Sequence, residues 1–263
     1  MAIRNYQGIK YNGSKSISVH ENLVVEQALK ISINKKVFTI TMRTPNDDMD
    51  LIRGLLYVED IYKSKEQLKI TLQENKENGI TEAEITIDEN WLGAGYSNSR
   101  NLLSVSSCGI CGKTALEELD VSKKIPKGFT ISVENLYATF EKMREKQFTF
   151  HQSGGSHAAA AFSKNLELLS VREDIGRHNA VDKVVGHLLN EHQLKSAKCL
   201  IVSGRISYEI VAKAFAANIP VLAAVSAPSS LAVDFAKELG ITLLGFCRTN
   251  KATCYSHPFR LVN

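Results

Sequence analysis

The chain has 263 residues, of which 44% are hydrophobic and 23% are charged, and its formal net charge is +4. This is the composition of a globular protein with enough apolar material for a real core, arranged as one large domain or two modest ones. The charge is mildly positive without a Lys- or Arg-rich run, which argues against nucleic-acid binding and is compatible with a small anionic ligand.

Nothing in the sequence predicts export or membrane insertion. The first seven residues contain no apolar segment of the signal-peptide kind, and no apolar stretch approaches the length of a membrane-spanning helix. We therefore expect a cytoplasmic protein without a membrane partner.

The first 105 residues predict an α+β module. Residues 26–33 and 36–42 alternate between apolar and polar and flank Asn34-Lys35, a pattern typical of a β-hairpin. Thr44-Pro45 ends the second strand, and a helix with Ile52 and Leu55 on its apolar face follows. Residues 67–73 and 81–88 predict two more strands.

Residues 106–130 are expected to be a mobile loop and linker. The preceding residues 91–100 are rich in Gly, Ser and Asn, which is typical of a loop. Gly109 and Gly112 flank the cysteines and let the backbone approach a partner closely.

Residues 131–263 predict an α/β domain. Ser132 is expected to cap a helix, and residues 157–162 and 166–171 to form a hairpin. An amphipathic helix follows with Asn179 as its candidate N-cap. Three continuous apolar runs then alternate with two helical segments (strands 199–203, 221–226 and 241–247; helices 206–217 and 230–239). This order predicts a mostly parallel sheet that is buried on both faces.

The cysteines divide into two groups. Cys199, Cys247 and Cys254 lie in or near apolar runs, where a cysteine is usually a buried apolar filler. Only Cys108 and Cys111 have a spacing with chemical meaning. Two cysteines at this spacing can pass sulfur, act as a redox dithiol, or hold a metal ion together with two further ligands.

The residues around the cysteine pair make a metal site and a redox dithiol less favoured than sulfur transfer, but they exclude neither. No second Cys-x-x-Cys is present, so a zinc site would have to recruit histidines such as His151 or His157. A thioredoxin-like dithiol usually lies early in a βαβ unit, whereas this pair follows a strand-rich module. The segment also imitates a phosphate-binding P-loop, but Ser107 stands where the first glycine is required.

Two further segments have the character of binding sites. Residues 172–179, Arg-Glu-Asp-Ile-Gly-Arg-His-Asn, lie between a strand and a helix N-terminus, and helix N-termini bind anions. Arg177 and His178 are therefore candidate ligand contacts, although the segment can also be a solvated connection. The other candidate is the carboxyl edge of the parallel strands, where Arg205, Arg248 and Lys251 add positive charge suited to a diphosphate.

Five segments together resemble the FdhD family of formate dehydrogenase accessory sulfurtransferases. They are Ser-Ser-Cys-Gly-Ile-Cys-Gly at 106–112, Gly-Gly-Ser-His-Ala-Ala at 154–159, Arg-Glu-Asp-Ile-Gly-Arg-His-Asn-Ala-Val-Asp-Lys at 172–183, Ser-Ala-Pro-Ser-Ser-Leu-Ala-Val at 226–233 and Gly-Phe-Cys-Arg at 245–248. They occur in the family's order, and the segment at 172–183 is the most specific of them. The N-terminal third matches only loosely.

The resemblance implies a sulfur carrier that serves a molybdenum- or tungsten-dependent formate dehydrogenase. A cysteine desulfurase would give sulfur to Cys108 as a persulfide, with Cys111 assisting. The protein would pass that sulfur to the bis-molybdopterin guanine dinucleotide cofactor, bound as a client rather than as a permanent cofactor. The cofactor-binding segment would be Phe246, Cys247, Arg248, Thr249, Asn250 and Lys251. A homodimer is also implied, and no metal site of the protein's own.

The same resemblance implies a three-layer, cytidine-deaminase-like fold for residues 131–263. The deaminase reaction is not expected. Zinc deaminases place a His-x-Glu at the second helix and a Cys-x-x-Cys at the third, and this chain has Arg177-His178-Asn179 and Ser203-Gly204-Arg205-Ile206 there. The alternative to a sulfurtransferase is a chaperone that binds the molybdopterin cofactor, with a Cys-x-x-Cys that is structural (zinc-binding) or a redox dithiol.

Overall fold

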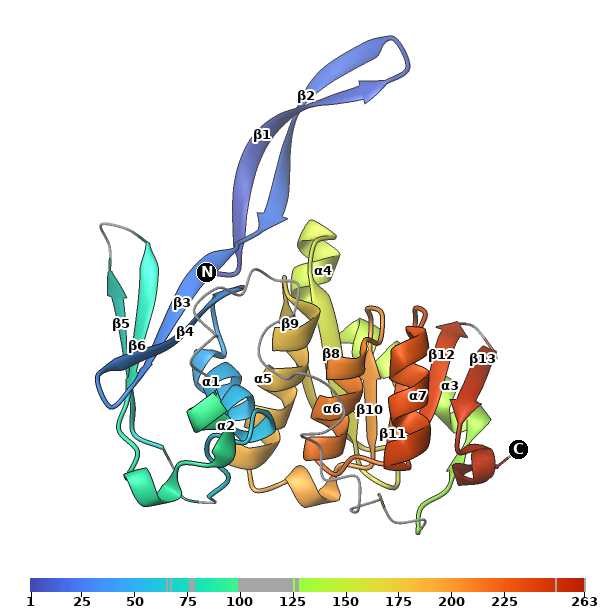
Figure 1. Cartoon of the computed structure of the whole chain (residues 1–263). Helices are drawn as coiled ribbons and strands as arrows, with labels where there is room; N and C mark the ends of the chain where they lie inside the picture. Colours follow the sequence, from blue (N-terminus) through green and yellow to red (C-terminus); the bar gives the residue numbers. More distant parts are fainter. Residues whose placement is uncertain are drawn as a thin grey trace.

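The computed structural model describes residues 1–64, 66, 68–75, 79–98, 125, 128–248 and 250–262 (Figure 1). They form two packed parts and one hairpin that stands away from both, formed by β1 (Ile3–Asn12) and β2 (Lys15–Val24). In this portion of the chain, no helix is long and apolar enough to cross a membrane.

The first part is a four-stranded sheet with a helix on one face. Its elements are β3 (Gln27–Ile33), β4 (Lys36–Arg43), α1 (Asp48–Val58), β5 (Ile70–Asn75), β6 (Ile80–Ile85), η1 (Glu89–Trp91) and α2 (Ala94–Asn98). The strand order is β4-β3-β6-β5. The predicted hairpin is confirmed as β3–β4, and Asn34 and Lys35 have φ angles of 51° and 64°, the left-handed pair typical of a type I′ turn. Ile31 of the sheet packs with Ile52 and Leu56 of α1 in one buried cluster.

The second part is a six-stranded sheet with helices on both faces. Its elements are β7 (Ile131–Ser132), α3 (Val133–Glu145), α4 (Phe148–Ser153), β8 (His157–Phe162), β9 (Leu168–Asp174), α5 (Arg177–Asn190), η4 (Leu194–Ser196), β10 (Cys199–Val202), α6 (Tyr208–Ala216), β11 (Val221–Ala224), α7 (Ser230–Leu239), β12 (Thr242–Arg248), β13 (Lys251–Ser256), η5 (Pro258–Arg260) and β14 (Leu261–Val262). The strand order is β13-β12-β11-β10-β8-β9, while β7 pairs separately with β14. The predicted cap of α3 is confirmed, because Ser132 accepts a hydrogen bond from the Asn135 amide.

The sheet is mixed, so the prediction of a mostly parallel sheet is wrong for the sheet as a whole. The three apolar strands β10, β11 and β12 are parallel, as predicted. The flanking pairs β8–β9, β8–β10 and β12–β13 are antiparallel. The reason lies in the connections: β8–β9 and β12–β13 are joined by short turns, and only antiparallel neighbours can be joined so tightly.

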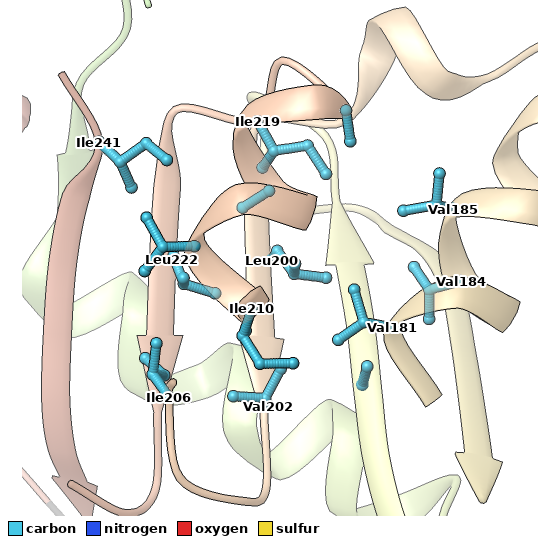
Figure 2. Packing of buried hydrophobic residues seen from close by; sticks show 14 of the residues in the cluster. Val181, Val184, Val185, Leu200, Val202, Ile206, Ile210, Ile219, Leu222 and Ile241 are labelled. Atoms are coloured by element: carbon cyan, nitrogen blue, oxygen red, sulfur yellow. The ribbon is translucent and has the colours of Figure 1, made fainter. Parts of the chain in front are cut away.

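The strand side chains alternate between two apolar layers. Leu200 and Val202 of β10 face α5, α6 and α7. Figure 2 shows these two side chains in one cluster with Val181 and Val184 of α5. Ile201, between them in sequence, belongs to the opposite cluster with Leu136 of α3. Burial on both faces explains why the strands are apolar without interruption. Whether the domain is specifically cytidine-deaminase-like stays a prediction.

Two glycines let α1 of the first part lie directly against α5 of the second. A Cβ atom added to Gly54 would lie 1.8 Å from the Asp182 carbonyl oxygen, and one added to Gly186 would lie 1.8 Å from the Asp50 carbonyl oxygen. The two helices therefore meet backbone to backbone. Around this crossing, Arg172 donates to the Asp50 carboxylate at 2.9 Å and 3.1 Å.

The predicted division into residues 1–105, 106–130 and 131–263 stays a prediction. Most of the expected linker, including Cys108 and Cys111, lies outside the described residues.

Candidate functional site

The loops that follow the three parallel strands are joined at one edge of the sheet. The Ile206 amide donates to the Ala227 carbonyl at 3.1 Å, and the Ser229 amide donates to the Ile206 carbonyl at 2.9 Å. The Phe246 amide donates to the Ser226 carbonyl at 3.1 Å, which ties the end of β12 to the same group. Ligands of open α/β sheets bind along this carboxyl edge.

A corner rich in nitrogen forms where β8 and α5 begin and β10 ends. Its members are His157, Arg177 and His178, with Gly204 and Arg205 opposite them. A Cβ atom at Gly204 would lie 3.2 Å from Nδ1 of His157 and 3.5 Å from Cβ of Arg177, so the glycine admits these side chains. We call these five residues the cationic corner.

Both imidazoles of the cationic corner are neutral near pH 7. Burial lowers the pKa of His157, and the positive charges of Arg177 and Arg205 lower it further, against an opposing effect of Asp174. Burial lowers the pKa of His178 to about 3, assisted by the charges of Lys213 and Arg177. The imidazoles therefore supply hydrogen bonds, while the two guanidinium groups supply the positive charge.

The side chain of Arg177 has unused donor capacity. Its Nε atom is buried and has no hydrogen-bond partner among the described residues. A buried donor without a partner costs free energy, about 1–3 kcal/mol, unless a ligand or water accepts its hydrogen bond. This geometry favours an anionic ligand at the corner.

Two helices point uncapped N-termini toward this edge. The N-cap residues of α5 and α6, Gly176 and Ser207, make no side-chain cap hydrogen bond. Ser207 Oγ lies instead 3.4 Å from Nε2 of His178. In α7, by contrast, Ser229 accepts a bond from the Ala232 amide and so satisfies its own helix. Uncapped N-terminal amides are suited to binding anions.

The segment from Phe246 to Lys251 covers the end of β12 and the start of β13. Arg248 and Lys251 are exposed and pair across the turn, and Thr249 lies outside the described residues. Phe246 is 47% exposed and has a φ of 54°, a strained conformation for an aromatic residue and one that clusters at functional sites. Asn250 also has a positive φ, of 60°.

Cys247 occupies a different position from its neighbours in this segment. Its side chain is buried in the cluster beneath α3, and burial raises the pKa of its thiol to about 12. Burial also raises the pKa of Cys199 and of Cys254. The cysteines of the described region are thus protonated and weakly reactive, in agreement with the prediction that they fill apolar positions.

Most of the charged residues in the segment 172–183 hold the chain together. Asp174 is fully buried; its Oδ2 atom lies 2.8 Å from Lys183 Nζ and accepts a bond from the Thr44 amide at 3.1 Å. Lys183 also donates to the Thr44 carbonyl at 2.9 Å. The Glu173 carboxylate accepts bonds from the Thr149 and Phe150 amides, both at 2.8 Å, and so caps the N-terminus of α4.

Asn179 is not the N-cap of the helix, contrary to the prediction. The helix α5 begins at Arg177, and its N-cap is Gly176, three residues before the predicted cap. The Asn179 amide group donates to Asp174 Oδ1 at 3.0 Å and to the Met42 carbonyl at 2.8 Å. The Asn179 side chain therefore joins the two parts of the molecule. Within the segment 172–183, Arg177 and His178 are the two residues that belong to the cationic corner.

Ser207 and Lys213 lie close to His178, and no sequence pattern pointed to either of them. Lys213 lies beneath His178 and is held by Asp182, whose oxygens are 2.7 Å and 3.0 Å from its Nζ atom. Burial raises the pKa of Asp182 to about 6 against the opposing effect of Lys213. The sequence around Lys213 does not indicate that this lysine lies near the site, because its ion-pair partner, Asp182, is on another helix.

Comparisons with known proteins agree on one family. Residues 24–262 match the model of the FdhD/NarQ family. The chain is 38% identical to the sulfur carrier protein FdhD of Sulfolobus acidocaldarius, over 99% of both chains. It is 40% identical to the protein of the same name from Nocardia farcinica, over 96% of this chain and 92% of that one.

A solved structure extends the likeness to the fold. A protein assigned as a formate dehydrogenase accessory protein from Desulfotalea psychrophila superimposes with a TM-score of 0.76 over the full length of both chains, at 18% identity. The family match covers nearly the whole chain, and relatives with about 40% identity align almost end to end. The chain therefore belongs to the FdhD/NarQ family.

Proposed function

We propose that this chain is a sulfur carrier that accepts persulfide sulfur from a cysteine desulfurase and transfers it to the molybdopterin cofactor of a formate dehydrogenase. Its relatives are named sulfur carrier proteins, and its fold is that of a protein assigned as a formate dehydrogenase accessory protein. The observation that carries the proposal furthest is the cationic corner with its unpartnered Arg177 Nε beside two uncapped helix N-termini. Such a site suits the diphosphates of a bis-molybdopterin guanine dinucleotide.

The sulfur chemistry is assigned to Cys108 and Cys111. In the loading step the Cys108 thiolate attacks the outer sulfur of the desulfurase persulfide. A new S–S bond forms at Cys108, the old one breaks, and the desulfurase thiolate leaves. In the delivery step the Cys111 thiolate attacks Sγ of Cys108, and the outer sulfur leaves as sulfide to the cofactor metal. The resulting Cys108–Cys111 disulfide then needs a dithiol reductant to restore both thiols.

The residues of the cationic corner and of the neighbouring sheet edge bind the cofactor. Arg177 and Arg205 provide charge at the cationic corner, and His157 and His178 provide neutral hydrogen-bonding groups. Arg248 and Lys251 extend the positive charge along the same edge. The guanine nucleotide portion of the cofactor is thus the part we expect the sheet edge to hold.

The loading step has a direct test. After incubation with a cysteine desulfurase and cysteine, we expect the intact protein to gain the mass of one sulfur atom and the peptide containing Cys108 to carry it. Replacing Cys254 with alanine should leave the gain unchanged. Stoichiometric zinc in the purified protein, with no gain of sulfur, would instead favour the cofactor chaperone with a structural Cys-x-x-Cys.

The binding step has a separate test that does not need the cysteines. We expect Arg248→Ala to weaken binding of guanosine diphosphate by roughly 10- to 150-fold, since a hydrogen bond to a charged group contributes about 1.5–3 kcal/mol. Arg205→Ala should act in the same direction. Isothermal titration calorimetry measures the effect, and Arg144→Ala on the exposed surface of α3 is the matched control. Identical affinities of wild type and both site variants would refute the assignment of the sheet edge.

A further inference from the structure

The strand β9 is an edge strand of the six-stranded sheet, next to β8 (Figure 1). In an antiparallel pair, alternate residues direct their backbone groups toward the partner strand and away from it. The Ala158 carbonyl of β8 accepts a bond at 2.9 Å from the Ser203 amide, just beyond β10, so the backbone of Ala158 faces β10. Residues 159 and 161 of β8 therefore face β9, where Arg172 and Ser170 are their partners in the register. The residues of β9 on either side of Arg172 direct their backbone groups away from the sheet.

Two backbone donors on the outer side of β9 are free. The amides of Val171 and Glu173 have no hydrogen-bond partner among the described residues, and no strand of the described chain pairs on that side. Their carbonyl groups differ, because these accept bonds from the side chains of Arg172 at 2.9 Å and Lys183 at 3.3 Å. The edge is therefore rich in donors, and a ligand that satisfies it has to supply acceptors.

A groove of about 400 Å³ runs along this free edge. Its lining includes residues 168–173 of β9, residues 44–47 before α1, and Lys146 and Phe148 at the start of α4. Phe148 is 63% exposed, so the groove has an uncovered aromatic wall. Ser170 Oγ belongs to the lining too; it is buried and has no hydrogen-bond partner in the described part of the chain. We call this groove the edge groove.

The charge left unpaired in the edge groove is positive. Glu173 is engaged in capping α4, and Asp47 lies 3.6 Å from the guanidinium group of Arg172. Lys146 is exposed and forms no ion pair within the described ranges. The edge groove is thus suited to an extended polypeptide segment. Its carbonyl groups would meet the free amides, an apolar side chain would meet Phe148, and a carboxylate would meet Lys146.

The position of the edge groove indicates which protein supplies this segment. The strand β9 ends at Asp174, which is paired in the register with His157 of the cationic corner, and Arg177 follows three residues later. A chain held against β9 therefore lies within a few residues of that corner. The enzyme that receives the cofactor has to approach the corner, whereas a cysteine desulfurase needs only the segment that contains Cys108.

We propose that the edge groove binds an extended, acidic segment of the formate dehydrogenase polypeptide, which joins the sheet as a strand beside β9. The carbonyl groups of the segment accept bonds from the Val171 and Glu173 amides, as in other cases of strand addition to a free sheet edge. The enzyme is thereby held next to the cationic corner during transfer. This inference rests on the proposed function, which supplies the identity of the partner.

Amide hydrogen exchange, measured by NMR, tests strand addition residue by residue. The probes are short overlapping peptides that cover the formate dehydrogenase of the same organism, added to the full-length protein. We expect an acidic peptide to slow exchange of the Val171 and Glu173 amides at least about tenfold. The Ser170 and Arg172 amides already face β8 and should change far less. Such alternation distinguishes an added strand from a small anion or a side-chain contact.

Two variants of the edge groove test the contacts separately. Val171→Pro removes one free donor and places a ring in the path of the added strand, while the pairing with β8 is kept because this amide faces outward. It should weaken peptide binding at least about tenfold, measured by fluorescence anisotropy. Lys146→Glu changes an exposed residue and should weaken binding roughly two- to fivefold. Lys237→Glu, on the exposed side of α7, is the matched charge control and should bind like wild type.

Sulfur loading separates failure of this inference from failure of the proposed function. Val171→Pro should load sulfur on Cys108 and bind guanosine diphosphate like wild type, and circular dichroism checks its fold. If it unfolds, Lys146→Glu and the exchange pattern of the wild type decide. If the wild type loads sulfur but no formate dehydrogenase peptide protects the two amides, the inference alone is wrong. If it loads no sulfur, the proposed function fails, and protection by such a peptide would still support the edge groove.

Two other occupants are outcomes of the same measurement. Peptides from the cysteine desulfurase form a second set of probes, and the protein alone is measured over a range of concentrations. Protection of the Val171 and Glu173 amides by desulfurase peptides, or by a second copy of this chain as the concentration rises, would overturn the proposal. Equal affinity of wild type, Val171→Pro and Lys146→Glu for the formate dehydrogenase peptide would overturn it as well.

Discussion

Replacing Cys108 with alanine should reduce formate dehydrogenase activity to the level found in a cell that lacks the protein. The physical reason is that no other described cysteine can replace it, because burial raises the pKa of Cys199, Cys247 and Cys254 and keeps their thiols protonated. Complementation of a deletion strain, followed by an assay of formate oxidation, measures the effect. The variant should still fold and should bind guanosine diphosphate like wild type.

The Cys111→Ala variant distinguishes the two cysteines. If Cys111 releases the sulfur, this variant should accumulate the persulfide on Cys108 and still fail to restore activity. Cys254→Ala is the matched control and should complement fully. Full activity of Cys108→Ala would contradict the persulfide assignment, and full activity of Cys111→Ala would restrict the sulfur chemistry to Cys108 alone.

The second large effect concerns stability. Lys183→Met should lower the free energy of unfolding by about 3–5 kcal/mol, because it leaves the fully buried Asp174 carboxylate without its cation. It also removes the bond from Lys183 to the Thr44 carbonyl, which links the two parts of the molecule. For a chain of this size we expect the melting temperature to fall by roughly 10 °C.

Thermal unfolding followed by circular dichroism measures this change. Lys164→Met, in the exposed turn between β8 and β9, is the matched control and should change stability by less than about 0.5 kcal/mol. A Lys183→Met variant as stable as the control would contradict the assignment of a stabilising role to the Lys183–Asp174 ion pair.

Local patterns in the sequence predicted the elements whose cause is local. The alternating residues around Asn34-Lys35 predicted β3 and β4, and the uninterrupted apolar runs predicted β10, β11 and β12. In these segments the pattern of apolar residues within each strand indicates which of its faces are buried. The hairpin formed by β1 and β2 was missed because both of its faces are exposed, so no continuous apolar face marks its strands in the sequence.

The segment 172–183 has a feature that local sequence patterns could not predict, namely which of its charged residues are internal. Its dense charge predicted a ligand-binding loop, and two of its residues, Arg177 and His178, do belong to the cationic corner. Asp174 and Lys183 instead neutralise each other in the interior, with Thr44 as a shared partner. Because Thr44 is about 130 residues away, only the folded chain decides which charges are internal and which are offered to a ligand.

The sequence by itself determined the family and the order of strands and helices in the second half, and it identified Cys108 and Cys111 as the candidate reactive pair. Residue chemistry, short spacings and periodicity are all properties of a contiguous segment, so they can be read without a fold. The tertiary structure decided the mixed pairing of the sheet, the meeting of α1 and α5 at Gly54 and Gly186, and the juxtaposition of Gly204 with His157 and Arg177. These features depend on distances between segments far apart in the chain, and such distances exist only once the core has packed.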